Sequence, residues 1–269
     1  MRFLRFVDQD EQTHFGIPLE GRHAEVLLGD PLTGFTPTDS VKSIARYLPP
    51  IDPATLICIG LNYRFHAEEG KAPIPAHPIV FFKNPSALTA HEEPIYLPRK
   101  LRSDSVDYEC ELAVIIGKKC LNATKENALS YVLGYTAAND VSARDWQKSG
   151  GGGQWCRGKS FDSFCPLGPV IVTADEIPNP NSLRIRTVLN DQVMQDWNTN
   201  DMIFDIPTLI EFLSADMTLL PGTVILTGTP HGVGMARTPP VWLQPGDTVT
   251  IDVEKIGELT NGVVEASAN

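Results

Sequence analysis

Residues 106–120 read VDYECELAVIIGKKC, a stretch that changes from alternating acids to an apolar run. Successive side chains of a β-strand point to opposite faces, so Glu109 and Glu111 share a face with the apolar Ala113 and Ile115. The other face is apolar throughout, which is typical of a strand that is covered on both sides. The stretch therefore predicts a buried strand with two carboxylates at one end.

Two neighbouring carboxylates at the edge of a hydrophobic core repel each other. Removing them from water costs free energy unless a cation binds between them. A hard divalent ion such as Mg²⁺ suits this place, because it binds carboxylate oxygens and keeps some of its waters. An acidic strand end in contact with solvent is the other interpretation. The strand alone leaves both open.

The chain has 269 residues, of which 42% are hydrophobic and 20% charged, so one large domain with a packed core is expected. Its net charge of -11 argues against nucleic-acid binding, which needs a basic face. The five cysteines are odd in number and form no CxxC pair, which argues against a disulfide scaffold or a zinc site. No apolar run reaches about 18 residues. We expect no membrane association and a cytoplasmic location, or a mitochondrial one for a processed eukaryotic chain.

Residues 1–50 predict a small β-rich N-terminal region, with short strands broken by glycine, proline and charge and a short helix over 41–50. Residues 51–269 form the main body. Its clearest helix begins after Asp205, a good N-cap, and ends near Ser214 or Asp216. Its strands are expected in 56–60, 78–83, 111–117, 169–174, 183–190, 223–228 and 247–257. This pattern favours a β-rich mixed α+β fold with few helices over a regular βαβ alternation.

The segment NDVSARDWQ, residues 139–147, contains a third acid. If 141–147 is helical, Asp140 is its N-cap, and Arg144 and Gln147 lie on one side. The simple interpretation is a cap with a surface ion pair. The functional one makes Asp140 a third metal ligand and offers Arg144 and Gln147 to a substrate carboxylate.

Two further segments carry side chains suited to catalysis. In GLNYRFHAEEG, residues 60–70, His66 and Glu69 are three positions apart, so one helical turn places them side by side. A carboxylate beside an imidazole supports a general base that activates water, although this spacing is common on exposed helices. In TVILTGTPHGVG, residues 223–234, Thr227 and Thr229 either face a ligand or belong to a plain turn.

The segment GQWCRGKS, residues 153–160, matches the pattern of nucleotide phosphate-binding loops. That loop must follow a buried strand and open a helix, whereas a run of glycines precedes this one and Pro166 and Pro169 follow it. We therefore expect a mobile glycine-rich lid instead. Lys159 is then either a cation for an acidic substrate or an exposed lysine at the end of a loop.

Taken together, the ordered motifs resemble the fumarylacetoacetate hydrolase superfamily over about residues 50–267. They are similar to the 2,4-diketo-3-deoxy-sugar-acid hydrolases as well. The motifs are IGLNYRFHAEE (59–69), PIVFFKNPSAL (78–88), VDYECELAVIIGKK (106–119), NDVSARDWQ (139–147), GQWCRGKSFDSFCPLGP (153–169), ILTGTPHGVG (225–234) and LQPGDTVTIDVEKIG (243–257). The resemblance implies a β-roll or sandwich core, a catalytic domain over 51–269 and a homodimer.

The same resemblance implies a set of site residues. Mg²⁺ or Mn²⁺ is expected at Glu109, Glu111 and Asp140, with Lys159 nearby. A dyad of His66 and Glu69, on a lid that orders with ligand, is expected to activate water, and Lys159 is expected to be a catalytic residue as well. Substrate contacts are expected from Arg144, Gln147, Lys159 and Thr229. Asp107 is left as a solvated acid or one that supports the site from behind, and His231 is given no role.

The implied substrate is a small acidic 2-oxo or 1,3-diketo acid that reacts through a metal-stabilised enolate. Our first expectation is C–C bond hydrolysis of an acylpyruvate or a fumarylacetoacetate-like diketo acid. The alternative is keto–enol tautomerisation or decarboxylation of oxaloacetate. A nucleotide-binding protein and an inactive metal-binding scaffold are the hypotheses from other classes.

Overall fold

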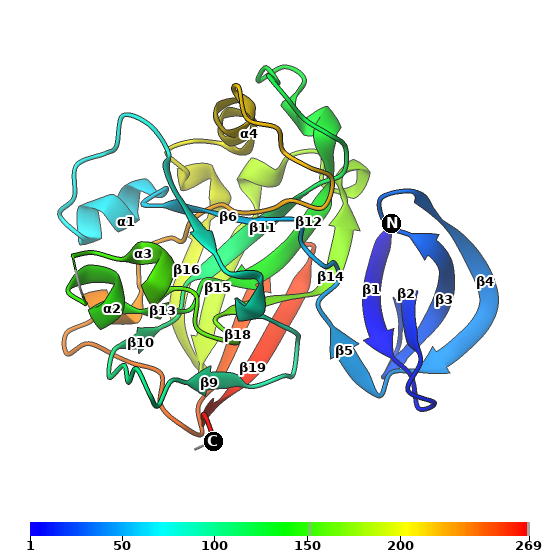
Figure 1. The fold of residues 1–269 in the computed structure, drawn as a ribbon, viewed down its shortest axis with the longest axis horizontal. Helices are drawn as coiled ribbons and strands as arrows, with labels where there is room; N and C mark the ends of the chain where they lie inside the picture. The colour runs from blue at the N-terminus through cyan, green and yellow to red at the C-terminus, as the bar shows by residue number, and fades with distance from the viewer. Residues whose placement is uncertain (151, 268–269) are drawn as a thin grey trace.

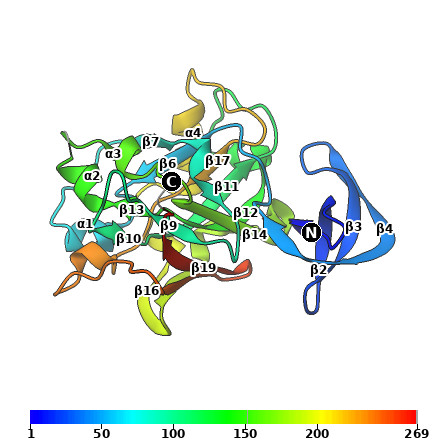
Figure 2. The ribbon, with the colours of Figure 1, turned by 60° about the horizontal axis from the view of Figure 1, so that its bottom comes forward.

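The computed structural model describes residues 1–150 and 152–267, which form the β-rich mixed fold that the sequence predicts (Figure 1). The N-terminal strands form a lobe beside the main body, and both views show this separation (Figure 2). Among the described residues, no helix is long and apolar enough to cross a membrane.

The N-terminal lobe is a meander of antiparallel strands joined by tight turns. Its strands are β1 (Arg2–Val7), β2 (Thr13–Leu19), β3 (His23–Asp30), β4 (Gly34–Ser43) and β5 (Arg46–Leu48). The helix predicted over 41–50 is wrong. Residues 41–43 belong to β4 and residues 46–48 pair with β1, so cross-strand pairing outweighs the weak helical pattern of this short segment.

The large sheet continues from this lobe into the main body, because β1 pairs with β14. Its order is β4-β3-β2-β1-β14-β12-β11-β17-β6-β7, with β5 on β1 and β8 on β14. The main-body members are β6 (Leu56–Gly60), β7 (Ile79–Lys83), β8 (Leu88–Thr89), β11 (Cys110–Ile116), β12 (Val132–Asn139), β14 (Cys165–Thr173) and β17 (Val224–Leu226). Every residue of β11 is buried, as the apolar run predicts.

A second sheet packs against the first, where β18 contacts β12 and β19 contacts β14. Its order is β16-β15-β18-β19-β9, and a two-stranded ribbon joins β10 to β13. These strands are β9 (Ile95–Leu97), β10 (Val106–Asp107), β13 (Ser142–Ala143), β15 (Arg184–Leu189), β16 (Gln192–Asn198), β18 (Thr248–Val253) and β19 (Gly257–Glu265). Buried aliphatic and aromatic side chains fill the space between the layers.

The helices are short and lie at the edges of the sheets (Figure 1). They are α1 (Arg64–Glu69), α2 (Arg144–Lys148), α3 (Trp155–Gly158) and α4 (Ile206–Ser214), with 3₁₀ turns at η1 (Pro85–Ala87), η2 (Ala128–Tyr131), η3 (Ala174–Glu176), η4 (Pro180–Ser182), η5 (Thr199–Asp201) and η6 (Gly234–Ala236). The α4 helix confirms the predicted cap, because the Asp205 side chain accepts a hydrogen bond from the Thr208 backbone N–H at 2.9 Å.

Candidate metal and substrate site

Three buried carboxylates meet where β11 and β12 pair. Glu109 precedes β11, Glu111 lies within it and Asp140 follows β12. The register aligns Cys110 with Asn139, and the Asp140 backbone N–H donates to the Glu109 carbonyl at 3.0 Å. One oxygen from each carboxylate lies within 4.8 Å of the others. These oxygens are the donor type that divalent ions such as Mg²⁺ prefer.

Asp140 does not cap a helix, so that expectation is wrong. Residues 142–143 extend as β13, and α2 begins only at Arg144 with Ala143 at its N-cap. The Asp140 side chain is therefore free to point inward, toward the other acids and two lysines.

Two buried ammonium groups contact Asp140 from different strands and loops. Lys159 Nζ lies 2.7 Å from Asp140 Oδ2 and 2.9 Å from Glu109 Oε2, and it donates to Ser142 Oγ at 2.7 Å. Lys83 Nζ lies 2.5 Å from Asp140 Oδ1. Both lysine side chains are buried, so Lys159 is not an exposed lysine at the end of a loop.

The carboxylates differ in how well cations balance them. Burial acts to raise the pKa of Glu109, but the charges of Lys159 and Arg144 outweigh it and lower this pKa to about 2. Burial and the neighbouring Asp140 and Glu109 raise the pKa of Glu111 well above its usual value. Glu111 accepts a hydrogen bond from the Gly228 backbone N–H at 2.6 Å and forms no ion pair within the described chain. A buried acid of this kind, among other acids, fits a divalent cation.

Arg144 connects the carboxylates to a further acid, Asp107. Its Nε donates to Asp107 Oδ2 at 2.9 Å, and its Nη1 lies 2.6 Å from Glu109 Oε1 and donates to the Gln147 side-chain oxygen at 3.0 Å. Its Nη2 forms a buried ion pair with the same acid, 2.8 Å from Asp107 Oδ2. Asp107 is fully buried, so the prediction of a solvated acid is wrong. Because Asp107 binds Arg144 and the Gly234 and Met235 backbone N–H groups, it supports the site from behind.

The His66 and Glu69 side chains lie side by side on α1, as their spacing predicts, with Nδ1 and Oε2 3.3 Å apart. Glu69 Oε1 also accepts a hydrogen bond from the Gly232 backbone N–H at 2.9 Å, which ties the helix to the loop after β17. Burial acts to raise the pKa of Glu69, but the hydrogen bonds from His66 and Gly232 together lower it. The acid beside His66 is therefore ionised at neutral pH.

Thr229 is held in place by a buried glutamine that sequence reasoning missed. Gln195 Nε2 donates to Thr229 Oγ1 at 2.9 Å and to the Pro230 carbonyl at 2.8 Å. Its side-chain oxygen accepts from the Cys110 backbone N–H at 3.0 Å. Gln195 lies on β16 with no neighbouring motif, so no signal in the sequence marks it. Lys83 did carry a signal, because it alternates with Phe81 on the buried face of β7.

Most of the predicted site residues line one pocket of about 240 Å³, whereas Glu69, Glu111 and Asp140 are not among its lining residues. His66, Glu109, Arg144, Gln147, Lys159 and Thr229 all line it. The GQWCRGKS segment borders it without forming a phosphate-binding loop, because α2 precedes it in place of a strand and Lys159 is buried among acids. Gly151 of the predicted glycine-rich lid lies outside the described residues.

Comparisons with known proteins identify the family of this chain. Residues 55–264 match the family described as fumarylacetoacetate hydrolase, C-terminal, and residues 1–47 match the one described as Rv2993c-like, N-terminal. The chain is 47% identical to the mitochondrial oxaloacetate tautomerase fahd2 of Xenopus laevis over 225 residues, which are 84% of this chain and 70% of that one.

Solved structures with the same fold carry the names of different reactions. The 5-carboxymethyl-2-hydroxymuconate delta-isomerase of Mycobacterium smegmatis aligns with a TM-score of 0.85 and 40% identity, over 99% of this chain and 100% of that one. The fumarylacetoacetate hydrolase of Exiguobacterium antarcticum aligns with a TM-score of 0.83 and 38% identity over the same shares. This chain thus belongs to the fumarylacetoacetate hydrolase family.

Proposed function

We propose that the protein interconverts the keto and enol forms of oxaloacetate, with Mg²⁺ or Mn²⁺ at Glu109, Glu111 and Asp140. The observation that carries the proposal is a small pocket lined by His66, Arg144, Lys159 and Glu109, the last of which belongs to the carboxylate cluster. The similarity to an oxaloacetate tautomerase favours this reaction over our first expectation, C–C bond hydrolysis.

A divalent ion at the three carboxylates supplies Lewis-acid stabilisation of the negative charge on the 2-oxo oxygen of an enolate. The protein's own groups do the rest. His66, oriented by Glu69, accepts the proton that leaves C3 of the substrate. The enolate oxygen takes a proton from water to give the enol, and the His66 imidazolium returns its proton to the solvent, so no proton is gained or lost overall. Arg144 and Gln147 line the pocket and offer N–H donors to a substrate carboxylate.

Lys159 contributes through its charge in this proposal. Its ammonium already contacts Glu109, Asp140 and Ser142, and an ammonium has three donors. Burial acts to lower the pKa of Lys159, but Asp140 and Glu109 raise it above the usual value. In the metal-free protein these two carboxylates therefore favour the charged form of Lys159, and we propose His66, beside Glu69, as the base.

The test is to mix the Mg²⁺-loaded protein with oxaloacetate and follow enol absorbance and pyruvate release together. Tautomerisation accelerates the change in enol absorbance and releases no pyruvate. Pyruvate from oxaloacetate indicates decarboxylation. Because His66 with Glu69 also suits water activation, hydrolysis of an acylpyruvate is the second candidate, and pyruvate from acetylpyruvate identifies it.

The His66→Ala variant tests the dyad in either reaction. Loss of a general base lowers turnover about 10²- to 10⁴-fold. Mg²⁺ affinity, measured by calorimetry, is expected to stay within about threefold of the wild-type value, because His66 is not one of the ligand carboxylates. Full activity in this variant contradicts the assignment of His66 as the base.

The division near residue 50, the homodimer and the compartment stay predictions. Separate family matches over residues 1–47 and 55–264 support the division. Size-exclusion chromatography with light scattering tests the dimer.

A further inference from the structure

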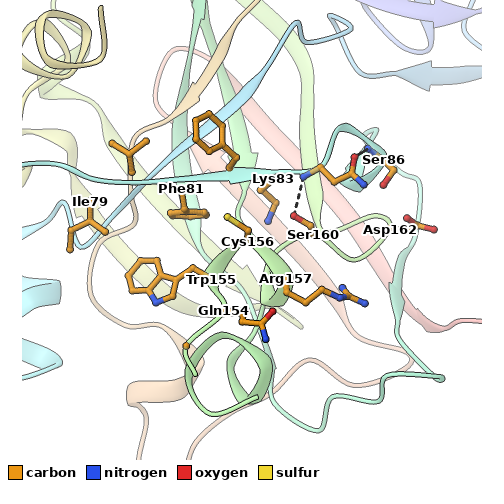
Figure 3. Close-up of a pocket in the computed structure, with 14 residues that line it drawn as sticks. Ile79, Phe81, Lys83, Ser86, Gln154, Trp155, Cys156, Arg157, Ser160 and Asp162 are labelled. Atoms are coloured by element: carbon orange, nitrogen blue, oxygen red, sulfur yellow. Dashed lines mark hydrogen bonds between the residues drawn. The ribbon is translucent and has the colours of Figure 1, made fainter. Parts of the chain in front are cut away.

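A second cavity, of about 1140 Å³, adjoins the site pocket, and the side chain of Trp155 lines both. Ile79 and Phe81 of β7 also line both cavities. We call this second cavity the outer groove. Figure 3 shows Trp155 below Ile79 and Phe81 at one end of the groove, with Arg157 and Asp162 toward the other. The proposed reaction uses none of these aromatic side chains.

The position of the Trp155 indole depends on a glycine. A Cβ atom at Gly60, the last residue of β6, would lie 2.3 Å from Trp155 Cζ3 and 2.9 Å from Cη2. Gly60 is not among the glycines with positive φ, so the indole's space requirement explains this glycine and backbone conformation does not. The chain thus provides a recess that holds the indole across the end of the pocket.

Lys159 and Phe81 lie between the carboxylate cluster and the Trp155 indole. Lys159 Nζ, which contacts Glu109 and Asp140, lies 5.2 Å from the centre of the Phe81 ring. The Phe81 and Trp155 rings then meet edge to face, with centroids 5.6 Å apart and planes at 70°. The indole therefore lies one aromatic ring away from the candidate metal site, on the apolar side of the pocket.

We propose that Trp155 is the end wall of the site pocket and limits the chain length of the 2-oxo acids that bind there. The inference rests on the proposed function, in which a divalent ion at the carboxylate cluster would hold the 2-oxo oxygen and Arg144 and Gln147 hold a substrate carboxylate. The remaining carbon chain then runs along Phe81 toward Trp155. Because 240 Å³ is below the roughly 300–1,000 Å³ of pockets for drug-sized ligands, a short acid fits and a long one meets the indole.

The outer groove gives this inference a measurable consequence. It lies directly beyond Trp155 and presents the apolar side chains of Ile79, Phe81 and Phe82, of which Phe82 is 43% exposed. Replacing Trp155 by alanine joins the two cavities. An alkyl chain too long for the pocket then continues into the groove and buries its methylene groups there.

The experiment measures binding of two straight-chain acids, 2-oxobutyrate and 2-oxooctanoate, to the Mg²⁺-saturated protein by titration calorimetry. Neither acid has a second keto group, so C–C bond hydrolysis cannot cleave either one. We expect the wild type to prefer the short acid. Because one methylene in an apolar pocket is worth about tenfold or more, Trp155→Ala should shift the ratio of the two affinities at least about tenfold toward the long acid.

Two further variants keep the result interpretable. Trp155→Phe removes only part of the ring, so it should shift the affinity ratio in the same direction but by a smaller factor than Trp155→Ala. It replaces the alanine variant in the test if that variant fails to fold. Trp242→Ala is the control, since Trp242 is also half-buried but lines neither cavity, and its ratio should equal that of the wild type. Thermal unfolding checks that each variant is folded.

The experiment distinguishes a failure of this inference from a failure of the proposed function. An unchanged affinity ratio in folded Trp155→Ala and Trp155→Phe overturns the role of Trp155 and leaves the proposed function standing. If the Mg²⁺-saturated wild type binds neither acid and leaves oxaloacetate unchanged, the proposed function itself fails, and the inference falls with it.

Discussion

Asp8 in the N-terminal lobe and the acids of the site are similarly buried, yet different groups stabilise them. Asp8 Oδ1 accepts hydrogen bonds from the Asp10 and Gln12 backbone N–H groups, both at 2.9 Å. Its Oδ2 contacts His14 Nε2 at 2.9 Å and Lys42 Nζ at 3.1 Å. All these partners belong to its own turn or to neighbouring strands of the same small sheet, so the lobe satisfies its buried acid locally.

The partners of the site acids come from distant parts of the chain. Asp140 contacts Lys83, 57 residues away, and Asp107 binds the Gly234 N–H, 127 residues away. Glu111 forms no ion pair within the described residues. The difference teaches that a carboxylate serving the fold is satisfied by its surroundings, whereas Glu111 in the site has no cationic partner among the described residues and is available to a bound cation.

The largest expected effect comes from Glu111→Gln, which removes the acid that lacks a cation. We expect this variant to lose Mg²⁺ binding by calorimetry and to lose at least about 10³-fold in turnover, because one metal ligand is gone. Metal binding and activity equal to the wild type would contradict the site assignment.

The same variant should make the metal-free protein more stable, by about 1–3 kcal/mol at neutral pH. An acid whose pKa is raised by folding destabilises the folded state increasingly as the pH rises above its usual value of 4.5. Glutamine has no such titration, so the variant's advantage is absent below that pH and grows above it. Saturating Mg²⁺ should reverse the order, because only the wild type gains binding energy.

Breaking a buried ion pair should give the next largest effect. Lys83→Met leaves Asp140 with one ammonium partner in place of two and fills the same space with an apolar side chain. We expect the free energy of unfolding without metal to fall by about 3 kcal/mol, measured in urea. Lys100→Met, at an exposed position, is the matched control. Equal unfolding midpoints for the two variants would contradict the role given to Lys83.

Asp107→Asn should affect catalysis more than metal binding. Asp107 positions Arg144 and is not one of the three carboxylates proposed to bind the metal. We expect kcat/KM for oxaloacetate to fall about tenfold, equivalent to about 1.4 kcal/mol, mostly through KM. Mg²⁺ affinity should change by less than about threefold. A loss confined to kcat with unchanged KM would indicate that Arg144 acts in the chemical step instead.

Asp8→Asn should have the smallest effect, a modest loss of stability with no change in activity. The hydrogen bond from the Gln12 backbone outweighs burial and lowers the pKa of Asp8, with help from His14 and Lys42. An acid of lowered pKa stabilises the fold above its usual value of 3.8 and loses that contribution as the pH falls through its folded pKa. The difference in melting temperature should therefore be constant from pH 5 to 8 and shrink below about pH 4.

Local patterns in the sequence were enough to predict much of the fold. Alternation over 109–116 indicates a strand covered on both faces, and Asp205 followed by apolar residues at helical spacing marks α4. The helix predicted over 41–50 is wrong because residues 41–43 pair with β3 and residues 46–48 pair with β1, which lies far back in the chain. Short apolar segments take their conformation from the neighbour they pair with.

The sequence by itself determined that Glu109 and Glu111 share a face, that His66 and Glu69 meet on one helical turn, and that the chain resembles a known family. Those features depend on the period of a strand or a helix, which holds wherever the element lies. Only the tertiary structure decided that Asp140 points inward beside Lys83, that Gln195 holds Thr229, and that Trp155 closes the pocket. Each of those contacts joins residues far apart in the chain, and local periodicity carries no information about which distant segments fold together.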